Sequence, residues 1–202
     1  MKKLLLASTI ALFGMVSAQS AGFEGTAFVT GQVGFSSTKD NNDNAKSSTI
    51  TVLPAMGTFI SPNIAIGGAL GVKSTTEEST NSLLTSTYKN TNTEFIVMPM
   101  VRKYWGLGDK LYIFGQVDAP LAWGKQKNES TGNTSTETKY SSWGLNVRPG
   151  LDFFVSKNWT FEATVGSVGF KSVKPEGGKS TDTFDFGVNL SSITFGVKYL
   201  FK

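Results

Sequence analysis

The chain has 202 residues, with 19 Lys and Arg against 15 Asp and Glu, and it contains no Cys and no His. This near balance of charge is not the clustered basic surface of a nucleic-acid-binding protein. The missing Cys and His remove disulfides, thiol chemistry and the commonest general base and metal ligand. We therefore expect no catalytic residue, no cofactor and no metal site.

The first 18 residues have the order of a secretory signal peptide. Lys2 and Lys3 precede the apolar run Leu4–Val16, and Val16-Ser17-Ala18 supplies small residues for cleavage. The apolar run is shorter than the ~20 residues of a membrane-spanning helix. We predict export with removal of residues 1–18, which leaves residues 19–202 as one domain.

Alternation of apolar and polar side chains dominates the rest of the chain. No run long enough for a helical membrane span follows the leader. From Gly25 onward the alternation has a period of two, which is typical of strands whose faces meet different media. The alternating segments predict the strands Gly25–Phe35, Thr49–Ile60, Ile64–Lys73, Thr93–Trp105, Lys110–Gly124, Tyr140–Val155, Trp159–Lys171 and Phe184–Phe201.

The connections between these segments alternate strictly between long and short. The long ones are the polar stretches Ser36–Ser48, Ser74–Asn92, Lys125–Lys139 and Ser172–Asp182. The short ones contain the turn residues of Ser61-Pro62-Asn63, Gly106–Asp109 and Ser156-Lys157-Asn158. Transmembrane barrels have this asymmetry, with short periplasmic turns and longer external loops. We expect the long connections either to lack order or to extend as hairpins above a membrane.

The tryptophans indicate which face of the strands points outward. All four lie on the apolar faces: Trp105 and Trp159 beside short turns, and Trp123 and Trp143 beside a long connection. Two such aromatic belts are typical of a protein whose apolar face meets lipid, because Trp favours the headgroup level. The alternative is a soluble secreted barrel with four core tryptophans and an apolar ligand.

The opposite faces carry polar and charged side chains, which we predict to fill the interior. An eight-stranded barrel leaves room only for side chains, so these groups must pair with one another. Asp118 and Arg148 lie at similar heights on neighbouring strands, and we expect them to bond. The predicted interior polar network contains Glu94, Arg102, Gln116, Asp118, Asn146, Arg148, Asp152 and Glu162, with Asp185 as a further inward charge.

Two further patterns concern the regularity of the wall. Pro54, Pro99 and Pro149 each share the apolar face and precede a short turn by the same interval. Because proline cannot donate to a ladder, we expect a local distortion at each. The last strand changes parity between Leu190 and Ile193, which predicts a β-bulge at Ser191-Ser192.

The C-terminal stretch "TFGVKYLF" carries the strongest motif. Thr194, Gly196, Tyr199 and Phe201 are spaced as in the sorting signal that outer-membrane assembly machinery recognises in a final strand. Together with the F-[IV]-S-x-N hairpins and the strands "MPMVRKYW" and "NVRPGLDFFVS", this motif resembles the small outer-membrane barrels of the OmpX and OmpA-barrel type. The family is the "outer membrane protein beta-barrel domain" family, often labelled porin-like.

The resemblance implies an all-β, eight-stranded, antiparallel up-and-down barrel in the outer membrane of a Gram-negative bacterium. It implies a structural or surface-interaction role, such as adhesion, defence or envelope integrity, and no enzymatic activity. The expected partners are outer-membrane lipid, lipopolysaccharide, the assembly machinery and an unidentified external ligand, with no nucleic acid and a monomeric state. A narrow pore for ions or small solutes is the alternative function.

Overall fold

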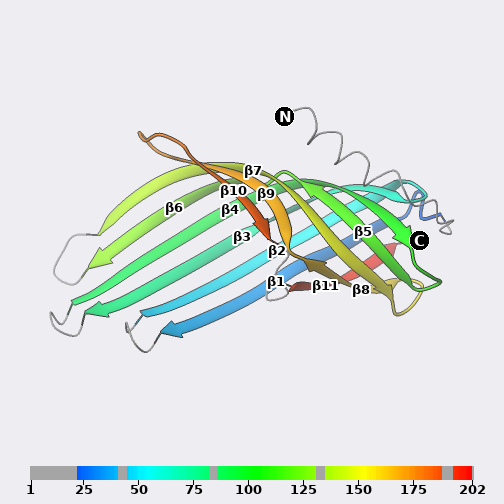
Figure 1. The fold of residues 1–202 in the computed structure, drawn as a ribbon, viewed down its shortest axis with the longest axis horizontal. Coiled ribbons are helices and arrows are strands. Elements are labelled where there is room, and N and C mark those ends of the chain that lie inside the picture. The colour runs from blue at the N-terminus through cyan, green and yellow to red at the C-terminus, as the bar shows by residue number, and fades with distance from the viewer. Residues whose placement is uncertain (1–21, 41–44, 82–85, 131–134, 188–192, 202) are drawn as a thin grey trace.

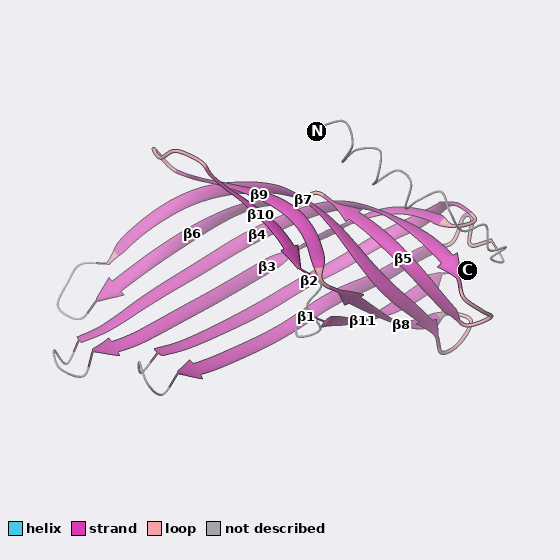
Figure 2. Cartoon of the chain, viewed as in Figure 1, coloured by secondary structure: helices cyan, strands magenta, loops and turns pink. Residues whose placement is uncertain are grey.

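A computed structural model describes residues 22–40, 45–81, 86–130, 135–187 and 193–201. The predicted signal peptide and the predicted bulge at Ser191-Ser192 lie outside these residues. The described part of the chain contains strands and loops without a helix (Figure 2). Correspondingly, within these ranges there is no helical segment with the length and hydropathy to cross a membrane.

All strands belong to one sheet in which every pairing is antiparallel. The described strands are β1 (Ala27–Asp40), β2 (Ala45–Ser61), β3 (Ile64–Asn81), β4 (Ser86–Gly106), β5 (Leu111–Asp118), β6 (Leu121–Ser130), β7 (Thr136–Phe154), β8 (Trp159–Val165), β9 (Ser167–Pro175), β10 (Thr181–Gly187) and β11 (Ile193–Phe201).

Near the short turns the sheet closes on itself. The pairings run from β1 through β2, β3, β4, β5, β7, β8 and β11 and return to β1, a circuit of eight strands. Toward the other end β6, β9 and β10 continue the wall, but among the described residues β10 does not pair with β1. The first and last strands lie side by side near the short turns, where Ala27–Val29 of β1 pair with Tyr199–Phe201 of β11 (Figure 1).

The described residues contain eleven strands where the sequence predicts eight, because three predicted strands are divided. Ala119 and Pro120 separate β5 from β6, and Gly166 separates β8 from β9. Gly166 has a φ of 67°, in the left-handed region that favours glycine. The last predicted strand is divided into β10 and β11.

The predicted polar loops are for the most part strands, which corrects the expected strand ends. Pairing between β2 and β3 continues outward to Ala45 and Ser79, and β3 and β4 pair as far as Asn81 and Ser86. The far ends of β2, β3 and β4 project to the left in Figure 1, at the end of the sheet opposite the short turns. Threonine favours strands despite being polar, so polarity alone misplaced the boundaries.

Polar pairs join the neighbouring strands of these hairpins. The hydroxyl oxygens of Thr49 and Thr75 are 3.1 Å apart across β2 and β3. Lys89 Nζ lies 3.2 Å from Glu78 Oε1, and Lys125 Nζ lies 3.1 Å from Glu137 Oε1. Each exposed pair contributes little by itself. Their number and register suit hairpins that continue into water.

Three inward aromatic rings lie over glycines directly opposite them on the neighbouring strand. Phe28 faces Gly57, Phe114 faces Gly150, and Tyr140 faces Gly124. A Cβ atom at Gly57, Gly150 or Gly124 would lie 2.5, 2.2 or 2.2 Å from the facing ring. The glycines therefore make room for rings that pack flat against the inner wall.

The three predicted proline positions lie on the outer wall, and each faces a glycine. Pro54 pairs with Gly31, Pro99 with Gly68, and Pro149 with Gly115. At Gly31 a Cβ atom would come within 3.2 Å of the Pro54 Cα atom, which is a tight contact. At Gly31 the small partner thus accommodates the strand where Pro54 removes a ladder donor.

Candidate functional site

The two faces of the wall carry opposite chemistry. Apolar side chains point outward, and Trp123, Leu145 and Phe161 are 53%, 50% and 55% exposed. Asp118 and Asp152 point inward and are 1% and 0% exposed. The charged face of the sheet is therefore the interior, and the apolar face is the outer surface.

Two ion pairs in the interior join strands that are not adjacent in the circuit. Arg102 Nη1 on β4 donates to Glu162 Oε2 on β8 at 2.7 Å. Lys198 on β11 forms an ion pair with Asp152 on β7, and its Nζ also lies 3.3 Å from the Tyr104 hydroxyl on β4. In the circuit of eight strands, β11 and β4 are diametrically opposite. The lumen is thus bridged from wall to wall.

A chain of hydrogen bonds extends this network along β4, β5 and β7. Arg102 Nε donates to Gln116 Oε1 at 2.6 Å, and Gln116 Nε2 donates to Asp118 Oδ2 at 2.7 Å. Asp118 accepts a bond from Asn146 Nδ2 at 2.8 Å and lies 3.1 Å from Arg148 Nε. Each buried charge named here has a partner of opposite charge, as a low-dielectric interior requires.

Sequence reasoning missed Lys198, which is fully buried at the centre of the network. It lies inside the C-terminal motif, whose residues we interpreted only as an assembly signal. The alternation of β11 contains the missing information, because Lys198 has the inward parity of Thr194 and Gly196. Gly196 pairs with Glu162, and a Cβ atom there would lie 3.0 Å from the Glu162 Cγ atom.

Aromatic rings close the interior on the side of the short turns. Phe23 lies before β1, and a turn with a 2.9 Å bond from Thr26 N to Phe23 O brings it into the barrel mouth. Its ring centroid lies 5.0, 5.3 and 5.4 Å from those of Phe59, Tyr112 and Phe154. This layer was not predicted, because Phe23 precedes the first alternating segment.

Little free volume remains beside the network. A cavity of about 10 Å³ lies between the Arg102–Glu162 pair and the apolar inner wall of Leu53, Ala55 and Met98. Such a volume holds about one water molecule. At this level the described residues fill the barrel.

Toward the long hairpins the interior opens into a polar vestibule of about 230 Å³. The predicted inward residue Glu94 lies here, apart from the central network. Tyr140 donates a 2.7 Å hydrogen bond to Glu94, and Lys171 Nζ lies 3.8 Å away. Lys171 points inward because the parity of the strand changes at Gly166. Asp185 pairs with Gly169 on the same inward parity but is exposed.

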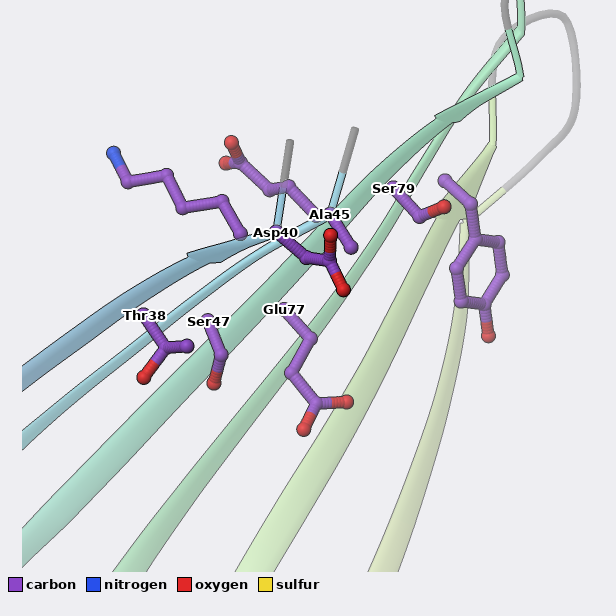
Figure 3. Close-up of a pocket in the computed structure, with 9 residues that line it drawn as sticks. Thr38, Asp40, Ala45, Ser47, Glu77 and Ser79 are labelled. Atoms are coloured by element: carbon purple, nitrogen blue, oxygen red, sulfur yellow. The ribbon is translucent and has the colours of Figure 1, made fainter. Parts of the chain in front are cut away.

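A second hollow lies on the inner side of the β1–β4 hairpins and has a volume of about 350 Å³. Asp40, Ser47 and Glu77 point to the same side of the strands (Figure 3). Within the part of the chain that the structure describes, no group of three or more acidic side chains is placed to hold a metal ion. The hollow is open and is lined mainly by polar and charged residues of the hairpins.

One external carboxyl has a perturbed titration. At the outer end of β6, Lys127 Nζ donates a 2.6 Å hydrogen bond to Glu129. The bond and the positive charge lower the pKa of Glu129. The side chain thus stays ionised to lower pH than an isolated glutamate.

Aromatic side chains gather at two levels of the outer wall. The ring centroids of Trp123 and Phe95 are 6.4 Å apart in a stacked arrangement, and those of Trp143 and Phe170 are 5.2 Å apart. Trp105 lies at the other level, as do Trp159, Tyr199 and Phe201. The ring of Tyr199 contacts those of Trp159 and Phe201, with centroid distances of 4.9 Å in both cases.

The spacing of the two levels suits a bilayer. Phe95 and Trp105 are ten positions apart on β4. At ~3.3 Å per residue and a tilt of about 45°, this interval spans about 23 Å, close to the apolar band of outer-membrane barrels.

The buried Lys198–Asp152 pair yields a stability prediction. Lys198→Met leaves the Asp152 carboxylate without its cation, so we expect the free energy of unfolding to fall by about 3–5 kcal/mol. Adding Asp152→Asn removes that charge and recovers part of the loss. Urea unfolding of the protein in detergent, followed by mobility of unboiled samples on SDS gels, measures both.

Lys127→Met is the matched control, because its partner Glu129 is exposed and the pair should contribute less than about 1 kcal/mol. Equal stabilities for Lys198→Met and Lys127→Met would contradict a central role for the buried pair.

Comparison with known proteins identifies the family. Residues 5–201 match the family model described as "Outer membrane protein beta-barrel domain". Similar solved structures include the N-terminal β-barrel domain of OprF from Pseudomonas aeruginosa, at 12% identity over 88% of this chain and 98% of that chain, with a TM-score of 0.38. Neisserial surface protein A (NspA) matches at 14% identity over 87% and 95% of the two chains, with a TM-score of 0.39. No curated protein matches the chain. Because the family model spans nearly the whole sequence, the protein belongs to the outer membrane protein beta-barrel domain family and resides in the outer membrane.

Proposed function

We propose that the protein is a non-enzymatic, monomeric barrel whose external hairpins interact with the cell's surroundings. Adhesion, defence and envelope integrity are the roles that such a surface serves. The observation that carries the proposal is the pairing of Arg102 with Glu162 across the lumen, together with the buried Lys198–Asp152 pair, whose cation also reaches Tyr104 on the opposite strand. A barrel filled at its centre is suited to support and display, and not to passage of solutes.

The external hairpins supply the interaction surface. Beyond the outer aromatic level, β2, β3 and β4 continue with polar side chains on both faces. The hollow that contains Asp40 and Glu77 opens from this extension. Lipopolysaccharide would surround the hairpins, and the C-terminal motif with Tyr199 and Phe201 would be read by the assembly machinery before insertion.

Planar-bilayer recording tests whether the lumen conducts. We expect the purified protein to give no reproducible single-channel steps, because the ion pairs and the layer around Phe23 fill the barrel. The double variant Arg102→Ala/Glu162→Ala removes two opposite charges together, and we expect it to show small steps that establish the sensitivity of the assay. A reproducible, solute-selective current from the unaltered protein would instead assign it a pore function.

Shortening a hairpin tests the interaction role. Ser74 and Thr93 are directly paired, so an Asn-Gly turn can replace residues 75–92 without disturbing the membrane-spanning wall. We expect cells that display this variant to lose adhesion to immobilised extracellular-matrix proteins or settling in suspension, whichever the unaltered barrel confers. Replacement of residues 175–180 in the β9–β10 hairpin is the control, since it leaves the hollow near Glu77 intact.

Both shortened barrels must still migrate as folded species when unboiled. Unchanged adhesion and settling after removal of residues 75–92 would overturn the proposed role of these hairpins.

A further inference from the structure

A groove marks the lipid-facing wall near the short turns, over β1, β2 and β3. Its volume is about 670 Å³. Its floor consists of the small residues Ala27, Thr58 and Gly68, and longer apolar side chains, among them Met56 and Ile66, border it. Met56 and Ile66 are 69% and 42% exposed on the outer face.

Strand register places the small residues side by side. Ala27 pairs with Thr58, and Thr58 pairs with Ile66, while Gly68 pairs with Met56 two residue pairs farther along. A Cβ atom at Gly68 would come no closer than 3.5 Å to its neighbours, so the backbone does not require glycine there. The absence of a side chain at Gly68 serves to keep the groove open.

A single cation stands beside this groove. Lys103 lies on the outer face of β4, opposite Ile64 and adjacent to the Ile66–Val101 pair. It is the one charged side chain that the described strands place on the outer wall between the two aromatic levels. Lys103 Nζ lies 5.6 Å from the centroid of the Trp105 ring. The ammonium group thus lies at the level of the lower aromatic belt, where a lysine reaches lipid headgroups.

We propose that the groove and Lys103 bind one glycerophospholipid of the periplasmic leaflet. An acyl chain lies along Ala27, Thr58 and Gly68, and the phosphate meets Lys103 beside Trp105. The site has the orientation that a periplasmic-leaflet phospholipid needs. Lys103 lies nearer the short periplasmic turn Gly106–Lys110, where the headgroup belongs, and the groove lies deeper, where the acyl chain belongs.

Native mass spectrometry of the detergent-purified protein with phosphatidylglycerol tests the site. We expect one lipid per barrel, and about fivefold weaker binding for Lys103→Gln, the loss expected for one cation near a membrane surface. Gly68→Leu fills the groove and should weaken binding at least as much. Dioleoylglycerol has the chains without the phosphate, so its weaker binding should be insensitive to Lys103→Gln.

Two matched controls separate a built site from general lipid adsorption. Lys110→Gln removes a cation from the short turn at the same end of the barrel, and Ala163→Leu enlarges an outward residue on β8 outside the groove. We expect both to bind phosphatidylglycerol like the unaltered protein, with folding verified by mobility of unboiled samples. The proposal is overturned if the unaltered protein retains no lipid, or if all five proteins bind it equally. Dissociation of an observed dimer by Gly68→Leu would assign the groove to a second copy instead.

Discussion

The structure depends on charges that are bonded across the interior of the barrel. Arg102 on β4 pairs with Glu162 on β8, and Lys198 on β11 pairs with Asp152 on β7 and bonds to Tyr104 on the opposite strand β4. Because buried ions are costly unless paired and hydrogen-bonded, each residue constrains the position of a strand distant in sequence. The cation of Lys198 also lies 4.9 Å from the Tyr104 ring, and Arg102 lies 4.8 Å from that of Phe114, so the ionic and aromatic layers support one another. The side chains that fill the lumen therefore also hold the strands of the closed wall in position.

The same strands serve two environments along their length. Between the aromatic levels their outer side chains are apolar with few exceptions, such as Lys103, and the backbone groups pair within the sheet. At the level of Phe95 and Trp123 the composition changes, and beyond it the outer face carries Ser74, Thr93 and Lys125. The hairpins outside the membrane are therefore continuous with the wall. This continuity gives the interaction surface a rigid base and places the hollow near Glu77 well away from the filled centre.

Alternation in the sequence predicted which face of each strand a side chain occupies. Successive side chains of a strand point to opposite faces however the strands are arranged, so this property can be seen locally in the sequence. It placed Asp118 and Arg148 on one face, and they are bonded there. The central role of Lys198 required knowledge of which strands oppose each other across the lumen, and that depends on circuit closure and register. The change of parity at Gly166 was missed because it rests on one left-handed residue, which moves Lys171 inward. Polar Thr-rich segments were assigned to loops, although their β-branched side chains favour strands wherever a paired neighbour is present.

The outward orientation of the apolar face is most directly tested by nitroxide scanning along β8. The chain has no cysteine, so single cysteines at positions 159–165 can each be labelled without other changes. We expect collision with oxygen dissolved in the lipid to be high at Phe161, Ala163 and Val165 and low at Thr160, Glu162 and Thr164. The reversed pattern, with high oxygen collision at Thr160, Glu162 and Thr164, would contradict a lipid-facing apolar wall. So would high accessibility of these three positions to a water-soluble nickel complex combined with low oxygen collision at Phe161, Ala163 and Val165.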